Sequence, residues 1–163
     1  MATAIEGQDL VVSFLGPTGF WSSTPPELFV HAYKTIFDTM RKYKIKVIYA
    51  TGTPYTPDAK DSNKFIARFI SFFIRIITHN LWKSFVLIGE LFDKEAEDLE
   101  WTISRVGRLS NETNKKTTAF EYVGAPGWTS STSRSGVAEW IVDQIERDDQ
   151  GWIRKKPAVC TSK

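Results

Sequence analysis

The chain has 163 residues, 42% of them hydrophobic and 25% charged, so it is long enough to bury one core and too short for two comfortable domains. Twenty-one lysines and arginines against nineteen acidic residues argue against a nucleic-acid surface and a polybasic membrane anchor. A single cysteine, Cys160, excludes an internal disulfide and a structural zinc site, so no metal is expected. We expect one globular domain over residues 1–163.

The first half of the chain alternates buried strands with a helical pattern. Residues 10–15 form an apolar run closed by a Gly-Pro-Thr-Gly turn, as expected of a buried strand. A helix over residues 25–44 follows, with Thr24 as its N-cap and a proline in its first turn. Residues 46–50 form another buried strand, which ends at the segment Thr51-Gly-Thr-Pro-Tyr55.

The second half continues this alternation. The predicted elements are helices at about residues 60–78 and 81–96, strands at 101–106 and 120–123, a helix over 134–146 capped by Ser133, and a short strand at 157–160. Strands that alternate with helices predict an α/β layer fold with a mainly parallel sheet of four or five strands. Such sheets bind ligands beyond the carboxyl ends of their strands.

No leader peptide or membrane span is predicted. The first residues lack a basic segment followed by an apolar one, so the sequence predicts a cytoplasmic protein. The most apolar stretch, Phe65 to Ile77, is interrupted by Arg68 and Arg75 and is shorter than the roughly 20 residues that cross a bilayer.

Two segments are distinctive enough to compare with a known family. They are Trp-Thr-Ile-Ser-Arg at residues 101–105 and Ser-Arg-Ser-Gly-Val-Ala at residues 133–138. Further matching segments are residues 4–12, 16–21, 48–53, 88–92 and 99–109. Together they resemble the later two thirds of the atypical short-chain dehydrogenases, the NmrA-like NAD(P)-binding family. The resemblance implies a truncated, three-layer Rossmann-like fold in which residues 10–15 form the family's fourth strand.

The resemblance also bears on the cofactor. The family's first strand, glycine-rich turn and first helix have no counterpart after Met1, and these parts hold the dinucleotide. We therefore expect no cofactor to bind in the usual way. The alternative is that the turn after residues 10–15 serves as a phosphate loop for NADP, although two prolines delay the helix that follows it. The turn residues that would then contact the cofactor are Gly16, Gly19 and Ser22.

The carboxyl ends of the predicted strands bring one set of side chains to the same edge of the sheet. The candidates for substrate binding are Phe20, Trp21, Thr51, Thr53 and Arg105. The aromatic members are expected to form an apolar wall for a hydrophobic small molecule, and the polar members to supply a few directed contacts. The alternative for each of them is an ordinary turn residue.

Three residues are candidates for proton transfer. They are Tyr55, Lys83 and His31. Short-chain dehydrogenases of the typical kind use a Tyr-x-x-x-Lys pair, but the matching helix carries Trp82 directly before Lys83, so standard hydride transfer is not predicted. The alternative for Lys83 is a solvated surface charge.

Three functions therefore stay open. The favoured prediction is a cofactor-independent isomerase, cyclase or lyase that acts on a hydrophobic metabolite through pocket shape and proton transfer. The second is an NAD(P)H-dependent reductase whose phosphate loop is residues 16–22 or comes from a partner chain. The third is a non-catalytic module that binds or senses nucleotides.

Two apolar surfaces predict a partner. The strand at residues 10–15 is expected at the edge of the sheet, with unpaired backbone groups and two apolar faces. The helix at residues 64–78 has only a narrow polar stripe. We expect a homodimer, or a complementing partner, that covers the strand Leu10–Leu15 or the helix Lys64–Thr78.

Overall fold

A sheet flanked by helices makes up the computed structural model, which describes residues 2–17, 19, 22–61, 78–113, 116–147 and 151–161. The helices are α1 (Ala2–Ile5), α2 (Pro26–Lys42), α4 (His79–Glu95) and α5 (Arg134–Glu146). The strands are β1 (Leu10–Ser13), β2 (Val47–Gly52), β3 (Glu100–Val106), β4 (Arg108–Ser110), β5 (Thr117–Phe120), β6 (Ser131–Ser133) and β7 (Ala158–Thr161).

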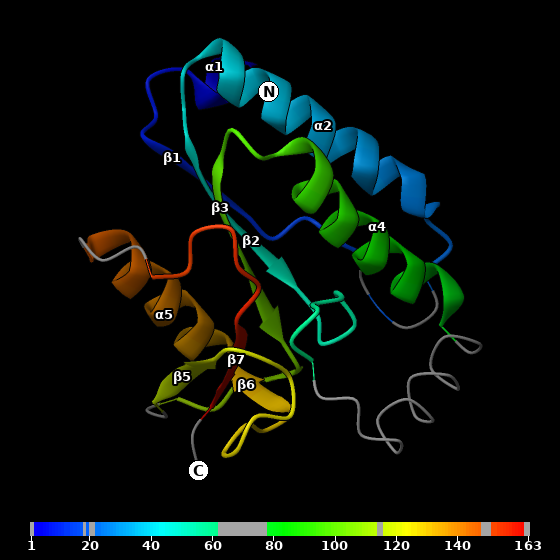
Figure 1. The fold of residues 1–163 in the computed structure, drawn as a ribbon, viewed down its shortest axis with the longest axis vertical. Helices are drawn as coiled ribbons and strands as arrows, with labels where there is room; N and C mark the ends of the chain where they lie inside the picture. The colour runs from blue at the N-terminus through cyan, green and yellow to red at the C-terminus, as the bar shows by residue number, and fades with distance from the viewer. Residues whose placement is uncertain are drawn as a thin grey trace.

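Five strands form one sheet in the order β1-β2-β3-β7-β5. The first four run parallel, and β5 is antiparallel to β7. Helices α2 and α4 cover one face of this sheet and α5 covers the other, so the molecule has three layers (Figure 1). This arrangement confirms the predicted Rossmann-like α/β fold with a mainly parallel sheet.

The sheet divides the hydrophobic core into two parts. On one face Phe37 and Met40 of α2 pack with Phe92 of α4 against Ile48 and Ile103 of the strands. The rings of Phe37 and Phe92 meet edge to face with their centroids 4.9 Å apart, a geometry worth about 1 kcal/mol beyond area burial. A smaller cluster between α5 and the strands fills the other face. The helical spacing of apolar residues in α2 produces this one-sided packing.

The two predicted helix caps have different outcomes. Ser133 caps α5 as predicted, because its Oγ accepts a hydrogen bond from the backbone N–H of Gly136 at 3.0 Å. The prediction of Thr24 as the cap of α2 is wrong: the capping position is Pro25, and no side chain bonds to the first turn. Proline favours the start of a helix because its ring restricts the backbone to helical φ, and this effect needs no side-chain hydrogen bond.

The strand predicted at residues 120–123 lies earlier in the chain, at Thr117–Phe120. Antiparallel pairing with β7 sets these bounds, and residues 121–124 turn away from the sheet. A second, two-stranded sheet of β4 and β6 was not predicted, because three-residue strands carry too little pattern. The predicted helix Lys64–Thr78 lies, except for Thr78, outside the described residues.

Strand β1 lies at the edge of the sheet, as predicted. Among the described strands it pairs only with β2. Val12 of β1 and Phe14, just after it, are 40% and 63% exposed, which is unusual for two large apolar side chains so close in the chain. The fold therefore leaves an apolar strand edge uncovered within the described part of the chain.

Candidate functional site

Three loops meet at one edge of the sheet because β1, β2 and β3 are parallel and in register. Ser13 pairs with Ala50, and Gly52 pairs with Arg105, so the carboxyl ends of the three strands lie side by side. Ligands of open α/β sheets bind in the crevice outside these ends. This carboxyl edge is the candidate site.

The loop after β2, residues 53–61, folds back on itself through Thr56. The N–H of Thr53 donates to Thr56 Oγ1 at 3.2 Å, and the N–H of Thr56 donates to the Thr53 carbonyl at 2.9 Å. The Thr56 side chain is 1% exposed and lies between two glycines. A Cβ on Gly52 would lie 2.6 Å from Thr56 Oγ1, and a Cβ on Gly89 would lie 2.8 Å from its methyl group. Both glycines are therefore needed for the close approach of this loop.

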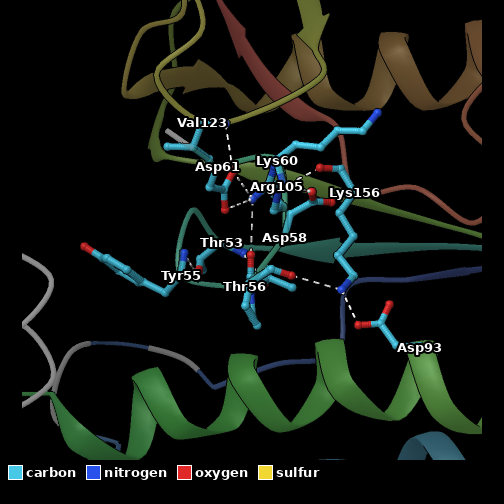
Figure 2. Close-up of polar contacts among 11 residues, drawn as sticks. Thr53, Tyr55, Thr56, Asp58, Lys60, Asp61, Asp93, Arg105, Val123 and Lys156 are labelled. Carbon is cyan, nitrogen blue, oxygen red and sulfur yellow. Dashed lines mark hydrogen bonds and ion pairs between the residues drawn. The ribbon is translucent and has the colours of Figure 1, made fainter. Parts of the chain in front are cut away.

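Two buried cations, Arg105 of β3 and Lys156 just before β7, fasten the same loop. Arg105 is 1% exposed, and its Nη1 donates to both carboxylate oxygens of Asp61, at 2.8 and 2.6 Å, and to the Thr56 carbonyl at 3.3 Å. Lys156 Nζ donates to the Pro57 carbonyl at 3.0 Å and to Asp93 of α4 at 2.6 Å. Figure 2 shows the two side chains next to each other, and Arg105 Nε donates to the Lys156 carbonyl at 2.7 Å. The loop is thereby rigidly positioned beside the crevice.

Tyr55 is the phenol that this loop presents. Its backbone N–H donates to Thr53 Oγ1 at 3.2 Å, and its ring points away from Arg105 (Figure 2). Burial of the half-exposed ring raises the pKa of the Tyr55 hydroxyl. Among the described residues this hydroxyl has no hydrogen-bond partner. It therefore stays protonated at neutral pH and is available to a ligand.

The loop after β1 is fastened to the helices. Tyr33 Oη donates to the Leu15 carbonyl at 3.0 Å and accepts from Ser13 Oγ at 3.2 Å. Burial raises the pKa of Tyr33 to about 12. Gly16 packs on Phe85 of α4, whose ring would lie 3.2 Å from a Cβ placed on that glycine.

The structure places only some of the predicted substrate-binding residues at the carboxyl edge. Thr53 lies at the carboxyl edge, and Thr51 lies on β2 with its Oγ1 3.5 Å from Ser104 Oγ. Arg105 lies below the carboxyl edge rather than in it, because its guanidinium is enclosed and paired with Asp61. It therefore exposes no group that could make the predicted contact with a substrate. The predicted aromatic wall, Phe20 and Trp21, lies outside the described residues.

The other two predicted proton-transfer residues lie on helices. Lys83 of α4 makes an exposed ion pair with Glu27 of α2, whose carboxylate is 2.8 Å away. His31 lies on the exposed side of α2. In the described part of the chain no hydrogen bond or ion pair joins either residue to Tyr55. Of the three candidates, the structure places Tyr55 in the loop at the carboxyl edge.

Four residues that organise the edge were missed by sequence reasoning: Thr56, Asp61, Asp93 and Lys156. Their partners are far away in the chain, since Asp61 and Arg105 are 44 residues apart and Asp93 and Lys156 are 63 apart. No local motif signals such pairs. The glycines at 52 and 89 were the available hint of a close approach.

The residues at the edge fit one half of a dinucleotide better than the other. A pyrophosphate needs free N–H groups at a helix N-terminus. Helix α2 begins with Pro25 and Pro26, which have no N–H, and carries the acidic Glu27 in its first turn. Gly19 does have the positive φ, 80°, of a tight turn, but Gly16 is packed against a ring. The edge after β2, with a free phenol beside a rigid loop, suits a nicotinamide ring and a substrate.

The fold is that of a Rossmann-like α/β protein. A family model described as NAD(P)H-binding matches residues 1–148, so the chain belongs to this family. The predicted resemblance to NAD(P)-binding, short-chain dehydrogenase-like proteins is thereby confirmed. No curated protein matches the chain.

Solved structures show the same fold. A short-chain dehydrogenase/reductase from Veillonella parvula in complex with NADP is 13% identical with a TM-score of 0.70, over 98% of this chain and 65% of that one. A Rossmann-fold NAD(P)-binding family protein from Shigella flexneri is 16% identical with a TM-score of 0.65, over 98% and 64%. An anaerobillin reductase from Escherichia coli O157:H7 is 15% identical with a TM-score of 0.62, over 98% and 66%.

The chain thus spans about two thirds of the length of these proteins. The prediction of cofactor-independent isomerase, cyclase or lyase chemistry gains no support from the comparisons. They favour the alternative, an NAD(P)H-binding protein of an oxidoreductase family. Within the described ranges no helix combines the length and the apolar character required to cross a membrane.

Proposed function

We propose that this chain forms the nicotinamide and substrate half of an NAD(P)H-dependent oxidoreductase site. The observation that carries the proposal is the position of Tyr55, a half-buried phenol on a rigid loop directly beyond the carboxyl end of β2. Ligands of doubly wound sheets bind beyond these strand ends. The family match supports a nicotinamide cofactor there.

The chain's own residues have two roles in this proposal. The loop of residues 53–61 positions the substrate carbonyl, and Tyr55 donates its phenolic proton to the carbonyl oxygen. When bound, NAD(P)H would supply the hydride for reduction of the carbonyl to an alcohol, and solvent would return a proton to the Tyr55 phenolate. The raised pKa of Tyr55 keeps the donor protonated through the neutral range.

The pyrophosphate half of the cofactor belongs, in this proposal, across the open edge of β1. Strands β1, β2 and β3 follow one another across the sheet in the order of the chain, whereas dinucleotides bind at the point where the strand order reverses. A second strand–turn–helix unit paired with β1 completes the crevice and covers Val12 and Phe14. The predicted homodimer that covers this strand stays a prediction, as does the cytoplasmic location.

Binding of two cofactor probes to the whole chain tests the proposal. NADPH and reduced nicotinamide mononucleotide, which lacks the adenosine phosphate half, are titrated separately by calorimetry. We expect saturable binding of both with dissociation constants within about tenfold of each other, because one tenfold step corresponds to the loss of a single weak contact. Absence of binding by both probes contradicts the proposal.

A hundredfold preference for NADPH would mean that this chain also holds the pyrophosphate, and would overturn the half-site assignment. If that preference is found, Gly19→Ala tests whether the turn after β1 holds the pyrophosphate, because a side chain at Gly19, whose φ is 80°, strains the backbone. With 4-nitrobenzaldehyde as substrate probe, Tyr55→Phe is expected to lower kcat about a hundredfold and to leave nicotinamide binding within twofold. An unchanged kcat contradicts the role of Tyr55.

A further inference from the structure

A cavity of about 520 Å³ opens beyond the carboxyl end of β3. It is lined by residues 108–112 together with Ser130 and Ser131, that is, by strand β4 and the start of β6. Six of the seven lining residues are polar, with one arginine, one amide, one carboxylate and three serine hydroxyls, and the seventh is Leu109. Because β3 is next to β2 in the sheet, the cavity lies on the same edge as Tyr55.

A backbone crossing forms the floor of this cavity. The N–H of Arg108 donates to the Ser130 carbonyl at 2.8 Å. A Cβ on Gly107 would lie 2.2 Å from that carbonyl oxygen, so only glycine permits the crossing. The position of Arg108 on the rim is therefore determined by rigid backbone rather than by a mobile loop.

Arg108 differs from Arg105, three residues earlier, in having an exposed side chain. In the part of the chain that the structure describes, the Arg108 guanidinium has no ion pair or hydrogen bond. The hydroxyl of Ser110 also finds no hydrogen-bond partner within the described protein, but its oxygen is buried. The donor capacity that the described protein leaves exposed to the cavity is therefore that of the Arg108 guanidinium.

We infer that Arg108 binds the carboxylate of the substrate, and that the substrate class is an oxo acid whose carbonyl lies toward Tyr55. This inference rests on the proposed function. A guanidinium binds a carboxylate through two parallel hydrogen bonds, and a free arginine on a rigid rim is suited to that contact. Arg108 follows the carboxyl end of β3, the strand that lies next to β2 in the sheet.

The test uses succinate as the anionic probe and succinamide as its neutral counterpart of similar size. Amide chemical shifts of the whole chain are followed by NMR at constant ionic strength, first without cofactor and then with reduced nicotinamide mononucleotide. We expect succinate to shift the amides of residues 108–112 and of Ser130 and Ser131 saturably, and succinamide to leave them unchanged.

Arg108→Gln is expected to weaken succinate binding by roughly tenfold or more, the loss of hydrogen bonds to a charged group. Arg147→Gln removes the same charge from an exposed position at the far end of α5 and is expected to leave binding within twofold. Arg108→Lys keeps the charge without the planar fork, and intermediate affinity is expected.

Equal shifts with succinamide, or unchanged binding in Arg108→Gln, would overturn the inference. The two proposals fail separately. Succinate binding without nicotinamide binding leaves the anion site intact and removes the oxidoreductase proposal, whereas nicotinamide binding without succinate binding removes only the role of Arg108.

Discussion

An arginine–aspartate pair lies at each end of the sheet, and the two pairs have similar distances but differ in burial and in the nitrogens that donate: Arg105 uses Nη1 alone, whereas Arg41 uses Nε and Nη2. At the carboxyl end Arg105 is 2.6 and 2.8 Å from the oxygens of Asp61, and at the amino end Arg41 is 2.7 and 2.9 Å from those of Asp98. The Arg105 side chain is 0% exposed and the Arg41 side chain 38%. Exposed pairs are screened by water, whereas removal of one buried partner leaves a charge without compensation. The carboxyl end is therefore the energetically sensitive one.

Substitution of the buried arginine is expected to have the largest effect. Arg105→Gln removes the guanidinium that bonds to Asp61 and to the Thr56 and Lys156 carbonyls, although Asp61 keeps its bond from the Val123 N–H. We expect the free energy of unfolding to fall by about 3 kcal/mol. Urea denaturation measures this loss. Arg108→Gln is the matched control, with a change within about 0.5 kcal/mol because its side chain is exposed. A loss below about 1 kcal/mol for Arg105→Gln would mean that the buried pair stabilises the protein no more than the exposed pair does.

Alkaline titration probes a buried neutral group at the same end. The pKa of Tyr33 is raised to about 12 by burial, against about 10 in the unfolded chain. The stabilisation is fully present below pH 10 and is lost as the pH rises from 10 to 12, because only the unfolded chain releases the proton there. We expect a loss on the order of 2–3 kcal/mol over this window.

Tyr33→Phe lacks this titration, so its unfolding free energy should be less dependent on pH between 10 and 12 than that of the parent. Stability measured by urea denaturation at pH 9, 10 and 11 separates the two proteins. Parallel curves would show that burial of Tyr33 does not carry the dependence.

Packing of the loop after β2 sharpens the comparison on a smaller scale. Gly89→Ala places a methyl group 2.8 Å from the Thr56 methyl, and we expect a loss of about 1–2 kcal/mol from overpacking. In a Thr56→Ser background that clash is absent. Alanine is the better helix former, so the same substitution should then stabilise by about 0.5 kcal/mol. Thermal unfolding of the four proteins gives the coupling, and an unchanged sign in both backgrounds contradicts the close approach.

The exposed pair at the amino end is expected to have the smallest effect. The hydrogen bond from Arg41 lowers the pKa of Asp98 to about 2. Its stabilisation is present above the unfolded pKa of about 4 and is lost as the pH falls toward 2. Because both side chains are well exposed, we expect Arg41→Gln to cost less than about 1 kcal/mol at neutral pH and less still in 1 M salt. A loss as large as that of Arg105→Gln would remove the distinction between the two pairs.

Much of the fold follows from local pattern. Helix α2 was predicted over residues 25–44 and is found at Pro26–Lys42, because apolar residues at helical spacing and a proline start are local signals. The Ser133 cap of α5 is local too. The pairing of β4 with β6 brings together residues more than twenty positions apart, and nothing in either short segment announces it.

The site was predictable in location but not in roles. Parallel strands must end at one edge, so Thr53 and Tyr55 were placed there from the sequence alone. Arg105 was predicted to contact the substrate and Arg108 was not a candidate, because the sequence does not show which of two nearby cations is buried. Only packing shows that the first is enclosed by residues 53–61 and the second faces a cavity.

What the sequence determined is therefore the order of strands and helices, since hydrophobic period and helix-start residues act within a few positions. What the tertiary structure decided is which charges face water. Burial depends on contacts between residues that are tens of positions apart, such as Asp61 with Arg105 and Asp93 with Lys156. Those contacts turn one arginine into a support for the loop and leave its neighbour free on the rim of the cavity.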